Sequence, residues 1–399
     1  MTRSFAVLLA LVLLTGGCGR PADEPRPSAS EGSSPANGQT ASGDWRAEAA
    51  AAVTRGVAAL EKMSADGKWL ADPKGKPDLG VTALATRAVI GTGGQSAAKW
   101  RSALDWLAAA QKDDGGIYDQ GLKTYITSAA VMAFVASKVP YYQKNIDQAA
   151  GFLAMIQSDE GDGLDESSED YGGVGYGGSG VVNLSTTQFA VDAADEAGLA
   201  KDHKFYSKAL KFLERSHNHS ESNDHQTKLP DGTVVVPGND GGGIYRPSDS
   251  KAGTHKLDDG RTVFRSYGSM TYALLKSYLL CNLDARDARV KSALKWIGDN
   301  WQLEYNPGME WVEKREARYM GLYYYYLTIV RCLDIAERQK VKLDAAALQG
   351  WRGKVARAIL DRQREDGSWI NHQDRWFEGI PALATAYSVI ALQVCLDER

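Results

Sequence analysis

The chain alternates between two helical patterns. Six times, a segment with an apolar stripe and a charged face runs into a polar turn, most clearly a turn built on Gly and an aromatic residue. The clearest copies are ALDWLAAAQKDDGGIY at 103–118 and VARAILDRQREDGSW at 355–369, and weaker copies begin at Gly56, Ala149, Ala209 and Ala293. Such a stripe predicts an amphipathic helix. Its recurrence predicts a repeat architecture built from helix pairs.

The segment that follows each turn is more apolar. Apolar and small residues occupy nearly every position, which is typical of helices that are buried on most sides. These segments are 81–90, 126–137, 184–199, 265–281, 322–336 and 380–396. We therefore expect an all-α fold in which six inner helices lie inside six outer ones, a six-hairpin α/α toroid. Closing the ring covers the apolar ends that an open solenoid leaves exposed.

One long stretch in the middle of the chain, residues 218–264, lacks this pattern. It is polar and rich in Asn, Asp and Gly, and TVVV at 233–236 is its lone short strand candidate. We expect a long irregular insertion that lies, with the Gly-rich loop at 171–180, at the end where the inner helices start. Loops held by a rigid scaffold commonly carry function.

Composition places the chain among ordinary globular proteins. Hydrophobic residues make up 43% and charged residues 24%, which is enough to build a large core. The formal net charge is -4, and the sequence holds no cluster of Lys and Arg with interleaved aromatic residues. Nucleic acid is therefore not an expected partner.

The first residues have the pattern of an export signal. Arg3 is followed by a short apolar stretch at 5–14 and by LTGGC, which ends at Cys18. This resembles the lipobox of bacterial lipoproteins, although Thr15 stands where Leu is preferred; a plain secretory signal is the alternative. We expect a signal peptide at 1–17, a lipid anchor on Cys18, a disordered tether at 18–44 and the toroid at 45–399. The expected location is the cell envelope, with the membrane as partner through the anchor.

The remaining cysteines and the histidines predict neither a metal nor a cofactor. Cys281, Cys332 and Cys395 each lie near the end of an apolar helix, where a buried small hydrophobic side chain is expected. The His cluster at 217, 219 and 225 lies in a polar segment that reads as a solvated loop. Metal ligation there is the weaker alternative.

The turns carry a resemblance to a known family. The residues similar to the QW-type repeat of squalene cyclases are 106–107, Gln111, 115–118, Gln363, 366–367 and Trp369. From about Trp45 onward the chain more closely resembles secreted bacterial prenyltransferase and squalene oxidase repeat proteins. The shared stretches are YGGVGYG (171–177), NLSTTQFA (183–190), NDGGGIY (239–245), RSYGSMTYA (265–273), GLYYYY (321–326) and DRWFEG (374–379).

The resemblance implies the α/α toroid of terpenoid cyclases and of protein prenyltransferase β-subunits, but not their chemistry. Class II cyclases open one inner helix with a DxDD-type motif, whose Asp protonates an alkene. At the counterpart here, Asp78 is followed by Gly80 and Val81 in the other acidic positions. Prenyltransferases hold zinc with an Asp-x-Cys pair and a distant His, and none of the three cysteines fits that spacing.

Polar and aromatic residues of the insertion and of the inner-helix starts are the candidate site. The possible acids are Asp240, Asp374 and Glu378, and the expected ligand-binding residues are Tyr176, Asn183, Gln188, Asn239, Tyr245, Arg265, Tyr267, Tyr323, Arg375 and Trp376. Helix starts direct N–H groups at this mouth, which favours an anionic or hydroxyl-rich ligand.

The leading hypothesis is an envelope lipoprotein that binds a small molecule, a glycan or a protein in this mouth, without class II cyclase chemistry. One alternative is an isoprenoid-active enzyme with a displaced acid. A second alternative is a glycan-active hydrolase or lyase, because carboxylates near aromatic platforms suit sugars.

Overall fold

The structure, a computed structural model, describes residues 44–72, 74–91, 97–177, 180–312 and 314–397. The expected signal peptide, Cys18 and nearly all of the tether fall in residues 1–43, outside the described residues. Residues Arg46–Arg399 form one compact unit. The first helix of the described residues starts at Trp45.

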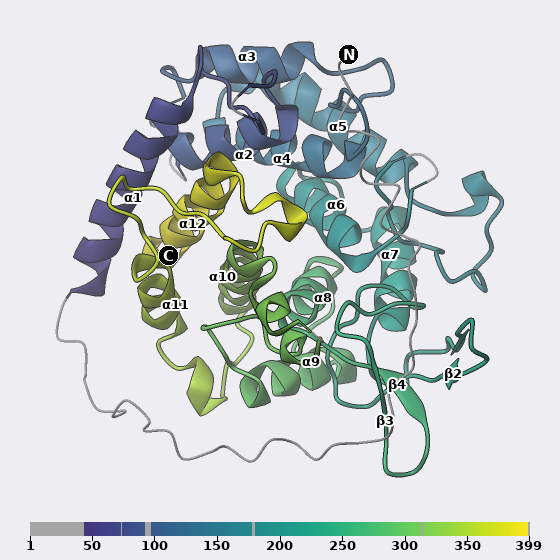
Figure 1. Cartoon of the computed structure of the whole chain (residues 1–399). Helices are drawn as coiled ribbons and strands as arrows, with labels where there is room; N and C mark the ends of the chain where they lie inside the picture. Colours follow the sequence, from purple (N-terminus) through teal and green to yellow (C-terminus); the bar gives the residue numbers. More distant parts are fainter. Residues whose placement is uncertain (1–43, 73, 92–96, 178–179, 313, 398–399) are drawn as a thin grey trace. The chain divides into compact units, whose positions relative to one another are not determined.

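The described residues contain twelve α-helices of two kinds (Figure 1). The even-numbered helices, whose residues are mostly buried, are α2 (Leu79–Ile90), α4 (Lys123–Ser137), α6 (Leu184–Glu196), α8 (Gly268–Leu280), α10 (Leu322–Arg338) and α12 (Pro381–Leu396). The odd-numbered helices, each with an exposed face, are α1 (Trp45–Met63), α3 (Arg101–Ala109), α5 (Gln143–Met155), α7 (Lys204–Arg215), α9 (Ala288–Asp299) and α11 (Trp351–Leu360). The expectation of a mainly helical chain is confirmed.

The even-numbered helices pack on one another in chain order, and α12 packs back on α2. The odd-numbered helices lie outside them in Figure 1. Short 3₁₀ helices occupy parts of the connections: η2 (Pro140–Tyr142), η3 (Glu160–Asp162), η4 (Met309–Trp311), η5 (Arg315–Tyr319), η6 (Ala346–Leu348) and η7 (Arg375–Phe377). The closed cycle of contacts brings the six inner-helix starts to one end of a common axis.

The Gln that recurs in two of the turns joins neighbouring helix pairs. The Gln111 amide donates to the carbonyl of Gly115 in its own turn, at 2.8 Å, and to that of Asn145 on the next outer helix, at 3.0 Å. Gln363 repeats this with Gly367 at 3.0 Å and with Ala52 of α1 at 2.9 Å. Each Gln therefore joins one helix pair to the next, and Gln363 joins the last pair to the first.

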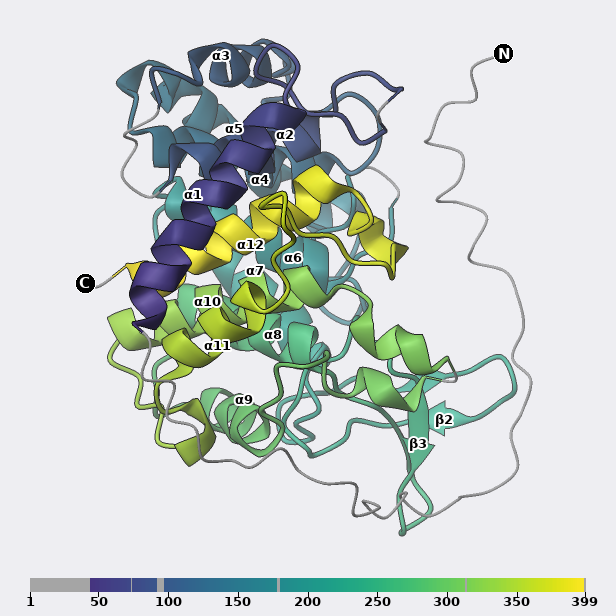
Figure 2. The ribbon, with the colours of Figure 1, turned by 60° about the vertical axis from the view of Figure 1, so that its left-hand side comes forward.

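The insertion is not irregular throughout, and the all-α expectation is wrong in this detail. It contains a small sheet with strand order β1-β2-β4-β3, in which β2 and β4 are parallel and the other pairs antiparallel. The strands are β1 (Thr227–Lys228), β2 (Val234–Val235), β3 (Thr254–Lys256) and β4 (Thr262–Phe264), and Figure 2 shows β2 and β3 to one side of the helices. Val235, Ile244 and Phe264 form its buried core. Strands this short give no periodic signal in the sequence, so only the 233–236 segment was expected.

Candidate site: a tyrosine mouth above a charged layer

Five half-buried tyrosines gather where the inner helices start. Tyr125 begins α4, Tyr324 begins α10 and Tyr387 lies in the second turn of α12, while Tyr176 and Tyr245 come from the loops before α6 and α8. The Tyr125 ring lies 5.9 Å from that of Tyr176, and the Tyr324 ring lies 6.5 Å from that of Tyr387, centroid to centroid. We call these five residues the tyrosine mouth.

The hydroxyl groups of the mouth bond to one another and to neutral neighbours. The Tyr176 and Tyr245 hydroxyls are 2.8 Å apart, and the Ser185 hydroxyl lies 2.8 Å from both the Tyr125 and the Tyr324 hydroxyl. Burial raises the pKa values of Tyr125, Tyr245 and Tyr324 above their usual range, so these hydroxyls stay protonated. The mouth is thus an uncharged set of exchangeable donors and acceptors.

The contact between Ser185 and Tyr324 crosses the axis of the ring. Ser185 lies on α6 and Tyr324 on α10, and α8 packs between these two helices in the cycle. Gln188, one turn deeper on α6, donates from Nε2 to the Tyr324 hydroxyl at 3.3 Å, while its buried Oε1 has no protein partner. The mouth therefore ends in an unused acceptor, and an unpaired buried oxygen of this kind costs about 1–3 kcal/mol.

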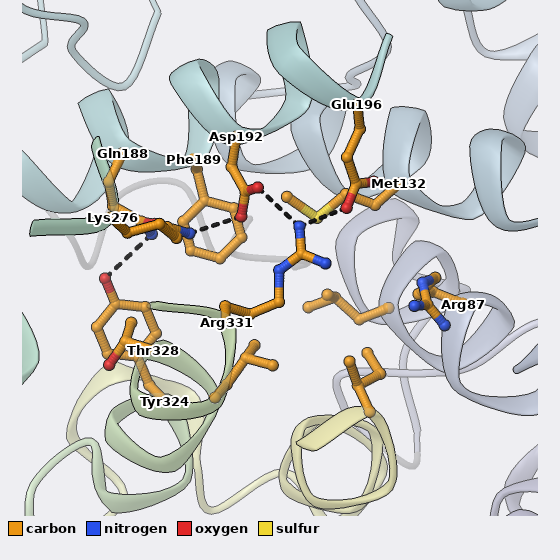
Figure 3. A pocket seen from close by; sticks show the side chains of 13 residues that line it. Arg87, Met132, Gln188, Phe189, Asp192, Glu196, Lys276, Tyr324, Thr328 and Arg331 are labelled. Atoms are coloured by element: carbon orange, nitrogen blue, oxygen red, sulfur yellow. Dashed lines mark hydrogen bonds and ion pairs between the residues drawn. The ribbon is translucent and has the colours of Figure 1, made fainter. Parts of the chain in front are cut away.

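Below the mouth the same helices carry a charged layer, formed by Asp192, Glu196, Lys276 and Arg331 (Figure 3). Asp192 accepts from Lys276 Nζ at 2.5 Å and from Arg331 Nη2 at 2.7 Å, and Glu196 also accepts from Arg331. Asp192 and Lys276 are almost fully buried. The two cations hold the pKa of Asp192 at about 2 against the opposing effect of burial. The layer encloses a cavity of about 30 Å³ beneath Gln188 and Tyr324.

Glu378 is the candidate acid that reaches the mouth. Its Oε1 accepts the backbone N–H of Tyr324 at 2.7 Å, and its Oε2 accepts from the Asn371 amide at 2.7 Å. Burial raises its pKa to about 7, although these donors and the first N–H groups of α10 favour the charged form. The side chain is 1% exposed, so Glu378 closes the start of α10 rather than lining an open groove.

The other two candidate acids lie apart from the mouth. Asp240 is in an exposed part of the insertion, where Oδ1 accepts the Gly242 N–H at 2.9 Å and the Ser266 hydroxyl at 2.8 Å. Asp374 is exposed at the start of η7. Asp78 caps α2 by accepting the Val81 N–H at 2.8 Å. The structure therefore does not bring Asp240, Asp374 and Glu378 together.

The predicted ligand-binding residues divide in the same way. Tyr176, Gln188 and Tyr245 belong to the mouth, and buried Tyr267 lies beside them. The remaining residues have local roles: Asn183 caps α6, Asn239 accepts from Ser220, Arg265 stacks on Trp311, Tyr323 donates to the Ile370 carbonyl, and Arg375 and Trp376 are exposed on η7.

The sequence prediction missed the four residues of the charged layer and, at the mouth, Tyr125, Ser185, Tyr324 and Tyr387. Each of the mouth residues lies within the first two turns of an inner helix, inside a run of apolar residues. The start of every inner helix lies at the same end of the axis. A Tyr or Ser within the first two turns of a predicted inner helix could therefore have been predicted to belong to the site.

The His cluster differs from the expected solvated loop. His217 is fully buried, and it donates from Nε2 to the Gly241 carbonyl at 3.0 Å while Nδ1 accepts the Tyr278 hydroxyl at 3.1 Å. Burial lowers its pKa to about 3, so the imidazole is neutral. Among the described residues, no three His, Cys, Asp or Glu side chains are placed to share a metal ion. Cys281, Cys332 and Cys395 are buried free thiols.

Comparison with known proteins agrees with this fold. Residues 36–232 match the squalene-hopene cyclase C-terminal domain family. An apo variant of the type II terpene cyclase MstE from Scytonema is 12% identical, with a TM-score of 0.53 over 88% of this chain and 97% of that one. A family 76 glycoside hydrolase from a bovine Bacteroides thetaiotaomicron strain is 11% identical, with a TM-score of 0.53 over 86% and 77%. No curated protein sequence matches the chain.

At these identities the solved structures establish the fold alone. None of the helices in the described part of the chain is both long and apolar enough to cross a bilayer. The resemblance inferred from the turns is confirmed at this level: residues 36–232 match the squalene-hopene cyclase C-terminal domain family, and the chain has the α/α toroid fold of solved type II terpene cyclase structures.

Proposed function

We propose that this six-hairpin toroid binds a hydroxyl-rich ligand, a glycan in the first instance, in the tyrosine mouth. The observation that carries the proposal is the convergence of five half-buried tyrosines, four of which have hydroxyls that bond to neutral groups. Ligand hydroxyls can replace such bonds at little cost, and the ring faces offer stacking surface. The unused Gln188 Oε1 is a ready acceptor for one ligand hydroxyl.

The test is a glycan-binding screen on the purified full chain, followed by calorimetry on any hit. Tyr324→Phe and Tyr176→Phe, which keep the rings and remove the hydroxyls, should each weaken binding by about tenfold, the value of one or two hydrogen bonds. Tyr141→Phe is the matched control, since Tyr141 is 69% exposed and lies outside the mouth. Equal affinity for all three variants would reject the mouth as the binding site.

Cyclase chemistry has less support. Protonating an alkene requires a strong acid in a dry cavity large enough for the substrate. Glu378, with a pKa of about 7, is a weak acid and already accepts several N–H groups. The axial cavity of about 30 Å³ has room for little more than one water molecule. A glycan hydrolase would need two carboxyls about 5–9.5 Å apart at the bound sugar, and Asp240 and Asp374 lie outside the mouth.

The N-terminal residues bear on where the protein is located. We infer from LTGGC that Cys18 is acylated after cleavage and that the following segment tethers the toroid to a membrane of the cell envelope. Mass spectrometry of the mature N-terminal peptide should show Cys18 as its first residue, carrying acyl chains. Cys18→Ala should release the protein from the membrane fraction. An unmodified Cys18 within a longer peptide would contradict the anchor.

A further inference from the structure

The axial cavity has an unbalanced set of charges. All six inner helices contribute to its wall, which carries the cations Arg87, Lys276 and Arg331 but only the carboxylates Asp192 and Glu196. Both carboxylates are engaged by Lys276 and Arg331. The third cation, Arg87, forms an ion pair with neither of these two carboxylates.

Arg87 has little to balance its charge within the described residues. It lies on α2, is 8% exposed, and its recorded hydrogen bond runs from Nη1 to the Gln393 Oε1 at 3.4 Å, a neutral and distant acceptor. Glu196 and, more weakly, Asp192 and Asp397 attract the guanidinium through space without a hydrogen bond to it, whereas Arg331 repels it and burial disfavours its charge. A buried cation without a hydrogen-bonded counter-charge is strongly unfavourable, so its surroundings should supply an anion.

The space beside Arg87 is suited to a small ion. In Figure 3, the Arg331 guanidinium lies in the middle of the cavity between Asp192 and Glu196, and Arg87 lies farther to the right. The volume of about 30 Å³ exceeds the roughly 10–15 Å³ that one water molecule needs. An anion between the two guanidinium groups would accept unused N–H donors from both and remove their mutual repulsion.

We propose that the axial cavity binds one small monovalent anion, of the size of a halide or formate, between Arg87 and Arg331. Asp192 and Glu196 keep Arg331 in place and oppose any anion of higher charge, so the site selects single charge as well as small size. The inference does not depend on what the tyrosine mouth binds. A water molecule alone in the cavity is the competing occupant.

The test compares anions at constant ionic strength on the full chain. Replacing sodium gluconate, too large for the cavity, by sodium chloride, bromide or formate should raise Tm by several degrees in a saturable way, because the anion binds only the folded state. Arg87→Gln should abolish this dependence and should raise Tm in gluconate, where the unpaired cation only destabilises. Arg286→Gln is the control, as Arg286 is exposed, and it should respond like the unaltered chain.

Crystals grown in bromide provide a second readout that does not rely on a variant. An anomalous peak between Arg87 and Arg331 would support the site even if Arg87→Gln failed to fold. A cavity that holds only water in bromide, together with identical Tm values in gluconate and chloride, would overturn the proposal.

Discussion

The tyrosine mouth and the charged layer, in the upper and lower halves of the inner helices, stabilise buried polar side chains with different interactions. Both halves bury polar side chains along the axis, but the tyrosine mouth uses neutral hydroxyls and the charged layer uses ion pairs. A hydroxyl contact can be exchanged for a ligand at little cost, whereas a broken buried ion pair leaves an uncompensated charge. The charged layer therefore keeps the helices in register, whereas the mouth can exchange its contacts, as the proposed ligand binding requires.

The largest expected effect comes from removing the carboxylate at the centre of the charged layer. Asp192→Ala should lower the free energy of unfolding by about 3–5 kcal/mol, because Lys276 and Arg331 are left with too few counter-charges. Urea denaturation measures this. The double variant Asp192→Leu with Lys276→Met should recover much of the loss, and a double variant no better than Asp192→Ala would contradict the charge-based explanation.

An intermediate effect should appear at Glu378, which borders the mouth. Its pKa is raised from the usual 4.5 to about 7, so the folded state binds the proton more tightly and stability falls as pH rises through this window. The fall amounts to about 3 kcal/mol. Glu378→Gln should remove it, making the variant the more stable protein at pH 8 and the equal of the unaltered protein at pH 4. Denaturation profiles of the same slope for both proteins would show that Glu378 does not titrate in this range.

The contribution of the charged layer to the free energy of unfolding should change with pH in the opposite direction. The pKa of Asp192 is lowered from 3.8 to about 2, so its contribution is present above pH 4 and is lost as pH falls toward 2. Together the two carboxyls predict a stability maximum near pH 4, between their usual pKa values of 3.8 and 4.5, with Glu378→Gln flattening only the alkaline side.

The smallest effect should follow from altering one hydroxyl of the mouth. Tyr324→Phe should lower the free energy of unfolding by about 1 kcal/mol, since Ser185 and Gln188 lose one neutral partner but keep the ring packing. Chemical denaturation beside Tyr141→Phe gives the comparison. A loss as large as that of Asp192→Ala would mean that the mouth is as rigid as the charged layer.

The sequence predicted what depends on local pattern. Helix type follows from periodicity, and the Gln111 and Gln363 turns are recognisable because each turn is completed within a few residues. The sequence pattern could not predict the axial contacts, because these contacts join residues that are far apart in the chain. Asp192 and Arg331 lie 139 residues apart, as do Ser185 and Tyr324. Which face of an apolar helix meets the axis depends on the closed ring, and so Tyr125 and Tyr387 looked like core residues.

Local polarity also misdirected the site prediction. Asn239 and Asp240 stand in a Gly-rich segment that suggests a ligand loop, yet their side chains bond to nearby backbone and hydroxyl groups of the insertion. Asn and Asp commonly make such turn contacts with residues close in sequence. Glu378 was a better choice because it follows an outer turn and immediately precedes the start of α12.

The contact of α12 with α2 has a consequence for how the chain acquires its structure during synthesis. Until the last sixteen-residue helix has emerged, α2 and α10 each lack a neighbour, and Gln363 and Arg357 are needed to hold α1 through Ala52 and Glu48. A nascent chain that stops short of α12 is therefore an open arc with two apolar edges. Such an arc exposes apolar surface to chaperones, and the toroid is completed only once α12 has been made.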